Sequence, residues 1–419
     1  MGEQAAGGRG GIAGIGLALA ALMAALPARA ELRVSAGTPI AIAVDDSALN
    51  LQPQRACDAA GNCVVAWDRF SFSAPQVGIV ARRYDALGKP RGGVFSASSQ
   101  PSNLQQSPSV AMLPSGEFVI AWEGTDPNGV TTGIFIRHFR ANGSPLGMDV
   151  EATSPVGGMA GASVAIDGSG RVVVAWWNLS GVYLRRFARN GRPLTPPLLV
   201  ETTDAAAVPA LAMRANGSFI LVWRTFQASS GAGIWAQRFD ASGAPLGDQA
   251  QVHSKAIPDL GTPEVATLPG GGFEVVWDSC DFAHLDLGCV VRMRRFTANG
   301  KARSPELEVS PPDFRVHWRP VVAADAHGDV AVAWEDCLVD NPVDRQPFDC
   351  KVAARFFDAL GNPGQEVWTI TSDDDLGDPA VAAGSGAFFV GYDSTRCDVR
   401  GCLGRSPTGA YVVRFAIQP

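Results

Sequence analysis

A short pattern of glycine, an apolar run and tryptophan recurs along the chain, and it constrains the fold more than any other feature. It occurs as SGEFVIAWE at residues 115–123 and again as GNCVVAWD, GRVVVAWW, GSFILVWR, GGFEVVWD and GDVAVAWE. A period of about 54 residues is typical of a propeller built from four-stranded β-sheets. The aromatic that ends the run, here called the ring aromatic, occurs in seven copies: Trp67, Trp122, Trp176, Trp223, Trp277, Trp334 and Tyr392.

Each copy predicts a series of short strands. A glycine stands six residues before every ring aromatic, where its access to positive φ allows a tight hairpin. The run before this turn carries an alanine in every copy and a proline in six of the seven. This suits an innermost strand, because its inner edge faces a central channel and is expected to need no hydrogen-bond partner, so a residue without an N–H is tolerated there. The apolar run itself predicts a second strand covered on both faces. A third strand ends in a motif such as RRF, and another glycine turn leads to a fourth.

The seventh copy ends at YVVRFAIQP and lacks a fourth strand. Before the first copy, however, the segment from Thr38 to Val44 has the pattern of a fourth strand. We therefore predict an all-β fold, a seven-bladed β-propeller of four-stranded blades, in which this N-terminal strand completes the last blade and closes the ring. The propeller is expected to form one domain over residues 31–419.

The VVAW-type strand, the RRFD-type strand end and the glycine-proline turn together resemble the tandem repeats of uncharacterised secreted bacterial proteins. The plan also resembles seven-bladed propellers in general, including integrin-α-like ones. The resemblance covers nearly the whole mature chain and implies the propeller fold, but this group has no settled activity to carry over. The D-x-D-x-D-G calcium loop of integrin-like propellers is missing from these copies, so the resemblance does not imply calcium binding.

The N-terminus is predicted to be an export signal. An apolar run from Ile12 to Pro27 follows Arg9 and leads into Ala28-Arg29-Ala30, a small-x-small cleavage pattern. We expect a signal peptide over residues 1–30, with an uncleaved anchor helix as the alternative. The mature chain is then secreted, periplasmic or attached to the cell envelope, without a membrane span.

The cysteines support export. All eight fall into close pairs, and an even count in an exported chain favours disulfides between neighbours. Zinc is the weaker alternative, because no pair has C-x2-C spacing and the five histidines are scattered. The predicted pairs are Cys57 with Cys63, Cys280 with Cys289, Cys337 with Cys350, and Cys397 with Cys402.

Function is expected where the copies differ, because the scaffold explains what repeats. The residue after the ring aromatic is acidic in five copies, and a further acidic stretch is expected on the same face. A divalent cation such as Ca²⁺ or a basic ligand could bind there; the alternative, which we favour, is a solvated acidic rim. These candidate binding residues are Asp68, Glu123, Asp278, Glu335, Asp393, Asp374, Asp375 and Asp378.

The loops that follow the ring aromatic are longest in copies five to seven, and each holds a predicted disulfide. Rigid irregular loops suit recognition, so we favour a non-catalytic, monomeric binding or scaffold propeller that recognises a protein or a glycan. The net charge of −7 and the lack of Lys/Arg clusters argue against a nucleic-acid partner.

The alternative function is a glycosidase-like hydrolase at the channel mouth. Glu264, Asp378 and Arg319 flank innermost strands, and a glycosidase needs two carboxyl groups at a defined separation. His317 and Trp318 also precede an innermost strand, although we favour a packing role for them. Because the sequence contains no G-x-S-x-G, HExxH or phosphate-loop motif, we favour a protein that is not an enzyme.

Overall fold

The computed structural model describes most of the chain after residue 31. The described ranges are 32–43, 48–71, 77–99, 105–125, 132–153, 159–202, 206–227, 231–254, 259–280, 288–313, 315–339, 347–372, 375–384, 386–396 and 406–418. All of them belong to one compact unit, Leu32–Pro419. The predicted signal peptide lies outside the described residues.

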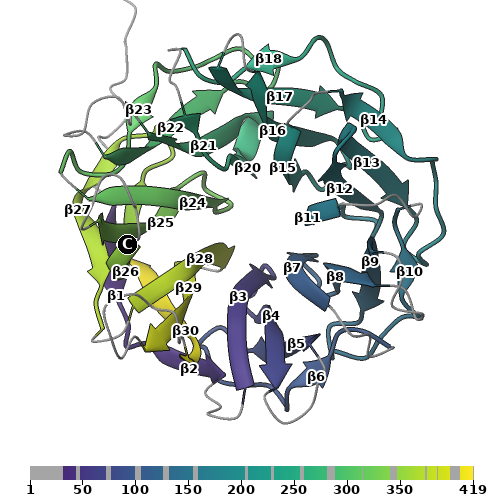
Figure 1. Cartoon of the computed structure of the whole chain (residues 1–419), viewed down its shortest axis with the longest axis horizontal. Helices are drawn as coiled ribbons and strands as arrows, with labels where there is room; N and C mark the ends of the chain where they lie inside the picture. Colours follow the sequence, from purple (N-terminus) through teal and green to yellow (C-terminus); the bar gives the residue numbers. More distant parts are fainter. Residues whose placement is uncertain are drawn as a thin grey trace, which may run out of the picture. The chain divides into compact units, whose positions relative to one another are not determined.

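The described strands form sheets around a central opening, so the fold is the predicted all-β β-propeller (Figure 1). Four of the sheets have four strands each, and their strand order follows the chain. These strands are β3 (Ala48–Cys57), β4 (Cys63–Ser71), β5 (Val77–Tyr84) and β6 (Phe95–Ser96); β7 (Gln105–Met112), β8 (Phe118–Thr125), β9 (Thr132–Phe139) and β10 (Val150–Glu151); β11 (Met159–Ile166), β12 (Val172–Asn178), β13 (Gly181–Phe187) and β14 (Leu198–Glu201); and β15 (Ala206–Met213), β16 (Phe219–Gln227), β17 (Gly231–Phe239) and β18 (Ala250–Gln251).

The prediction of seven separate blades is wrong in that form, because copies five and six share one sheet of nine strands. A single parallel bridge between Cys289 and Val316 joins their ladders. The described strands therefore form six sheets. The strands of this sheet are β19 (Asp259–Leu260), β20 (Glu264–Thr267), β21 (Phe273–Cys280), β22 (Cys289–Phe296), β23 (Leu307–Glu308), β24 (Val316–Ala324), β25 (Val330–Val339), β26 (Pro347–Phe357) and β27 (Pro363–Ile370), and a 3-10 turn, η1, covers Pro269–Gly271.

The N-terminal segment pairs with the last sheet, as predicted. This sheet contains β28 (Asp375–Gly384), β29 (Ala387–Arg396) and β30 (Ser406–Gln418). Strand β2 (Ile40–Ala43) pairs antiparallel with β30, with Ile40 opposite Val412. An additional strand that was not predicted, β1 (Arg33–Ala36), pairs further along β30.

The first strand of each copy lies nearest the central opening (Figure 1). These inner strands contact one another in a closed order, from β3 through β7, β11, β15, β20, β24 and β28 back to β3. Five of the predicted prolines follow a β-bulge residue whose φ is positive, between 44° and 55°. A bulged residue is left out of the ladder, so its N–H needs another acceptor. The five residues are Gln52, Ser107, Val208, Arg319 and Asp378.

The expectation that the inner edge needs no hydrogen-bond partner is only partly right. The hydroxyl of Ser109 accepts a hydrogen bond from the N–H of Val164 at 3.1 Å, and that of Ser163 accepts one from the N–H of Leu211 at 3.0 Å. Each bond joins the inner strands of neighbouring sheets. Serine side chains therefore accept hydrogen bonds from backbone N–H groups at the inner edge that have no neighbouring strand to pair with.

The ring tryptophans fill the space between sheets, as predicted. All six have side chains that are at most 2% exposed. The seven hairpin glycines adopt positive φ, from 64° to 92°. At one of them, Gly217, an added Cβ would lie 2.8 Å from Asp167 Oδ2, so the close approach of the neighbouring turn excludes a side chain as well.

The RRF motif ties the first six copies to one another through arginine clasps, which we define as guanidinium hydrogen bonds to a backbone carbonyl of an adjacent copy. The first arginine of the motif reaches the preceding copy: Arg185 donates to the carbonyl of Ala152 at 3.1 Å and Arg294 to that of Val252 at 2.8 Å. The second arginine reaches the following copy: Arg83 donates to Ala141 at 3.0 Å and Arg238 to Ala298 at 2.9 Å. The motif is therefore explained by packing between sheets.

Three of the four predicted disulfides are formed, namely Cys57–Cys63, Cys280–Cys289 and Cys337–Cys350. Each links two neighbouring antiparallel strands. The fourth is not observed, because Cys397 and Cys402 both lie outside the described residues. The disulfide between Cys397 and Cys402 therefore stays a prediction.

The strands account for all the long elements of the fold that the structure describes. No helix in the described part of the chain is long and apolar enough to cross a membrane.

Candidate functional site at the central opening

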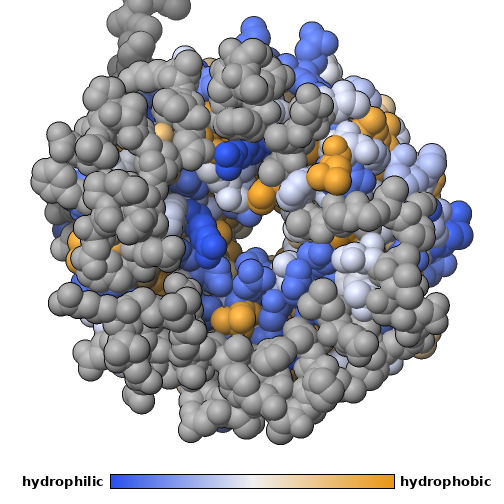
Figure 2. All heavy atoms as spheres, in the orientation of Figure 1, coloured by the Kyte–Doolittle hydropathy of each residue, from blue (hydrophilic) through white to orange (hydrophobic). Residues whose placement is uncertain are grey.

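Hydrophilic side chains gather along part of the rim of the central opening (Figure 2). The acidic residues that follow the ring aromatics, however, are not a solvated rim, and that expectation is wrong. All five are between 4% and 7% exposed. They are Asp68, Glu123, Asp278, Glu335 and Asp393.

The burial of these carboxylates has a structural cause in the bulges of the inner strands. The N–H of Ser107 donates to Asp68 Oδ2 at 3.3 Å, and the N–H of Asp378 donates to Glu335 Oε1 at 2.8 Å. In both cases the donor is a left-handed residue in the following copy. A carboxylate from one sheet thus satisfies the N–H that the next sheet leaves out of its ladder.

Arg319 brings the carboxylates of copies six and seven together. Its Nη1 lies 3.2 Å from Glu335 Oε1 and 2.9 Å from Asp378 Oδ1. Asp393 lies in the same group, because a Cβ on Gly377 would be 3.2 Å from its Oδ1 and 3.4 Å from Glu335 Oε1. Burial raises the pKa of Asp393 well above its usual range, and the charges of Asp378 and Glu335 raise it further.

Asp68 differs from the carboxylates around Arg319 because one of its oxygens has no hydrogen-bond partner among the described residues. This oxygen, Oδ1, is buried. Burial raises the pKa of Asp68 to about 8, and the charges of Asp378 and Glu123 add to the effect. Asp68 therefore holds a proton near neutral pH, and it is electrostatically coupled to Asp378.

Two further acidic residues with raised pKa values lie in copy five. Burial raises the pKa values of Glu264 and Asp278 to about 7 each. Asp278 Oδ1 accepts a hydrogen bond from the N–H of Thr262 at 3.1 Å. The backbone of Gly261 approaches this carboxylate so closely that an added Cβ would lie 1.8 Å from Oδ2. No described ion pair links Glu264 to the Arg319 group.

The other predicted residues have different surroundings. The carboxylate of Asp375 accepts a hydrogen bond from the N–H of Cys350 at 2.9 Å and thereby fastens the disulfide-bearing strand. Asp374 lies outside the described residues. The packing role favoured for His317 is confirmed, because its ring is fully buried, accepts the indole N–H of Trp334 at 3.1 Å and donates to Asp313 at 2.9 Å.

The described residues contain no group of three or more His, Cys, Asp or Glu side chains that could hold a metal ion. The carboxylates of the Arg319 group are instead compensated by the guanidinium and by backbone N–H groups. The structure therefore gives the calcium hypothesis no described ligand set.

One buried charge was missed at the sequence level. Arg55 is 7% exposed, its Nε and Nη2 have no partner among the described residues, and its guanidinium lies 5.1 Å from the centre of the Phe389 ring. Burial holds its pKa well below the usual range. The sequence could have indicated this buried arginine, because the residue at the same inner-strand position is apolar in the other copies, as in Val110 and Val322.

The buried acids predict that the folded protein becomes less stable as the pH rises from about 4 to about 8. The pKa of Asp68 is about 8 in the folded state against an ordinary value of 3.8, so the folded state holds a proton that the unfolded state loses. The stabilisation is complete below pH 4 and is lost as the pH approaches 8. Thermal unfolding at pH 5 and pH 8 should show this slope, and Asp68→Asn should reduce it. An unchanged slope in the variant would contradict the assignment to Asp68.

Comparison with known proteins shows similarity at the level of the fold. No family model and no curated protein matches the chain. A Dyadobacter fermentans protein of unknown function has 13% identity, covering 92% of this chain and 99% of that chain, with a TM-score of 0.56. An α-L-arabinofuranosidase of Fusarium graminearum with an iminosugar inhibitor has 12% identity, covering 91% and 98%, with a TM-score of 0.52. A Penicillium chrysogenum α-L-arabinanase complexed with arabinobiose has 14% identity, the same coverage and a TM-score of 0.50.

Proposed function

We propose that the protein is a secreted glycoside hydrolase that cleaves a polysaccharide at the central opening, with Asp68 as the general acid and Asp378 as the general base. The observation that carries this proposal is the contrast between the two coupled carboxyl groups. Asp68 is buried, protonated near neutral pH and has one free oxygen. Asp378 pairs with Arg319 and is more accessible, with a side chain that is 24% exposed. A carboxyl group that keeps its proton, together with a second carboxylate that pairs with a guanidinium, is the arrangement that acid–base hydrolysis requires.

The roles follow from the chemistry of the glycosidic bond. Asp68 would give its proton to the glycosidic oxygen as the bond to the anomeric carbon breaks. The hydroxide part of a water molecule would add to the anomeric carbon, and the remaining proton would pass to Asp378. Arg319 holds the Asp378 carboxylate in place through its Nη1 at 2.9 Å. The bond from Ser107 N–H to Oδ2 leaves Oδ1 as the oxygen of Asp68 that can carry the transferred proton.

The fold comparison also supports the hydrolase over the binding propeller. Propellers named α-L-arabinanase and α-L-arabinofuranosidase share the fold over about nine-tenths of this chain. The binding hypothesis places recognition in the long loops of copies five to seven, and residues 281–287, 340–346 and 397–405 of those loops lie outside the described part of the chain. Recognition by those loops therefore stays a prediction.

The assignment is tested by the release of reducing ends from a panel of polysaccharides, with arabinan included because of the compared propellers. Asp68→Asn keeps an acceptor for the N–H of Ser107 but removes the proton, so we expect activity to fall by about 100-fold or more without a loss of melting temperature. Asp378→Asn should have a similar effect. Glu308→Gln, on an outer strand, is the control and should be fully active. Full activity in Asp68→Asn, or sugar binding by the native protein without any cleavage, would refute the proposal.

We also propose that the ring has seven repeat units, with copies five and six sharing the nine-stranded sheet, and that the chain belongs with the secreted bacterial tandem-repeat proteins it resembles. The closed succession of inner strands and the spacing of the ring aromatics support the count. The three disulfides are compatible with an extracellular or periplasmic location, which the predicted signal peptide would provide.

A further inference from the structure

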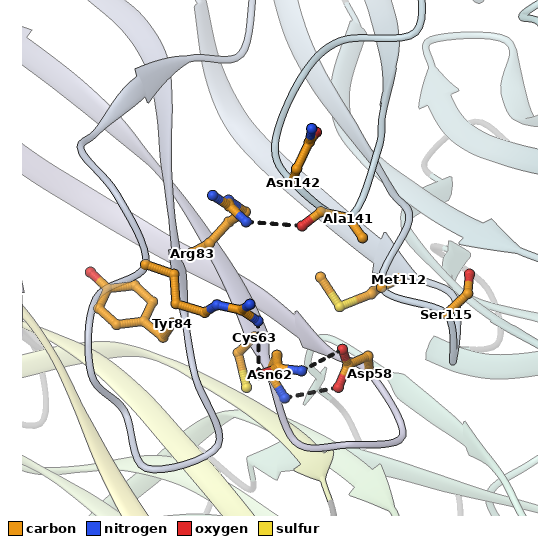
Figure 3. Close-up of a pocket in the computed structure, with 11 residues that line it drawn as sticks. Asp58, Asn62, Cys63, Arg83, Tyr84, Met112, Ser115, Ala141 and Asn142 are labelled. Carbon is orange, nitrogen blue, oxygen red and sulfur yellow. Dashed lines mark hydrogen bonds between the residues drawn. The ribbon is translucent and has the colours of Figure 1, made fainter.

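A cavity of about 340 Å³ lies between the first two sheets, away from the carboxylates of the central opening. It is lined by the turns that begin and end their strands, and Figure 3 shows Arg83, Met112 and the bonded pair Asp58 and Asn62 around it. The cavity borders Cys63, whereas Asp68 is five residues further along β4, about 17 Å at the usual rise of a strand. The cavity is therefore separate from the proposed catalytic site.

The cavity contains two guanidinium groups with no carboxylate partner in the described part of the chain. Arg83 is bonded through Nη1 to the carbonyl of Ala141 at 3.0 Å, and Arg91 through Nη1 to Asn62 Oδ1 at 3.1 Å. Neither bond partner carries a charge, and each guanidinium keeps further N–H donors. Burial and the positive charge of Arg91 lower the pKa of Arg83, in keeping with two guanidinium groups that line the same cavity.

Asp58 is the acidic residue among those that line the cavity, and its oxygens are already used. Oδ1 accepts the N–H groups of Ala60 at 2.9 Å and Asn62 at 2.8 Å, and Oδ2 accepts the side-chain amide of Asn62 at 2.9 Å. These bonds hold the carboxylate in its own hairpin turn. Two arginines and one aspartate leave the cavity with a net charge of about one positive unit, which a single anionic group would balance.

We propose that this cavity is a binding site for an anionic saccharide unit, whose carboxylate or sulfate group is held between Arg83 and Arg91. Planar guanidinium groups are well suited to oxyanions because they donate two parallel hydrogen bonds. The volume is more than ten times the ~30 Å³ of a water molecule and lies in the range of small-molecule sites, so it accommodates more than a bare ion. Met112 offers an apolar surface, and Ser115 and Asn142 offer polar groups at the edge for the rest of the ligand.

Binding is measured by thermal shift and calorimetry with glucuronate, inorganic sulfate and glucose as probes, at constant ionic strength with chloride as the replaced anion. We expect glucuronate to raise the melting temperature in a saturable way by about 2–4 °C, and glucose to have no effect. Sulfate should compete with glucuronate, because both use the same guanidinium pair. Sulfate binding without glucuronate binding would overturn the saccharide assignment.

The matched variants are Arg91→Gln and Arg186→Gln. Arg186 occupies the position of Arg83 in copy three and clasps Ala241 and Ser242, but Asp240 and Asp167 act on its charge. We expect Arg91→Gln to weaken glucuronate affinity at least tenfold and Arg186→Gln to leave it unchanged. An equal response in both variants and the native protein would overturn the site. Glucuronate binding is measured without any cleavage, and Arg186→Gln should leave polysaccharide cleavage unchanged, so the binding result is independent of the proposed hydrolase activity.

Discussion

Replacing Trp223 by alanine should lower the free energy of unfolding by about 3–5 kcal/mol, the usual cost of removing a large aromatic side chain from a packed core. Trp223 is fully buried and packs with Val173, Leu184 and Phe219 between the sheets of copies three and four. The neighbouring strands are fixed by their own ladders and by arginine clasps, so they can close the cavity only in part. Denaturant unfolding gives the difference directly.

Two variants sharpen the measurement on Trp223. Its Nε1 has no hydrogen-bond partner among the described residues, so Trp223→Phe loses volume but no polar contact and should cost much less than alanine. Leu179→Ala serves as the surface control, because that side chain is 83% exposed. A cost for Trp223→Ala as small as that of Leu179→Ala would show that the tryptophan is not a packing element between the sheets.

Removing residues 32–43 should destabilise the ring as a whole rather than one sheet. Strands β1 and β2 cover one edge of β30, and deletion would leave a long row of unpaired backbone groups there. Ile42 is 3% exposed and shares a core cluster with Trp67 of the first copy and Val412 of the last. The hydroxyl of Tyr84 also donates to the carbonyl of Ile42 at 3.3 Å. The segment therefore connects the first copy with the last copy.

This deletion is measured by comparing a chain that begins at residue 44 with one that begins at residue 31. We expect a single cooperative transition at a clearly lower melting temperature, or no folded protein at all. Ile42→Ala, which keeps the β2 ladder but removes the core contact, should cost about 2–5 kcal/mol and show the packing part alone. An unchanged melting temperature in the truncated chain would contradict the role of this segment in closing the ring.

The sequence predicts the fold well because its main determinants are periodic. Ring tryptophans, hairpin glycines and inner-strand prolines each have one structural cause that repeats, and the register of the antiparallel ladders follows from them. The sharing of one sheet by copies five and six could not be predicted, because it depends on a single bridge between Cys289 and Val316. Such a bridge depends on the distance between two strand ends, and the identity of the residues does not predict that distance.

The candidate site was predicted in part. The acidic positions were found, but their burial was not, because it depends on residues far away in sequence. Asp68 meets the N–H of Ser107 from 39 residues away, and Glu335 meets that of Asp378 from 43 residues away. Both donors are in a left-handed conformation that is uncommon for residues other than glycine. A pattern based on residue types therefore suggested solvated acids where the structure has buried ones.

The arginine clasps have a consequence for how such a chain can change. Each clasp ends on a peptide carbonyl, a group that every amino acid supplies, so the receiving residue is under no demand to be of any particular kind. Two neighbouring repeats can then accumulate substitutions in their outer turns independently, while the hydrogen bonds between them are kept. A repeat that carries both arginines supplies the donors for its hydrogen bonds to the preceding and the following repeat. Duplication or exchange of a whole repeat is therefore compatible with a closed ring.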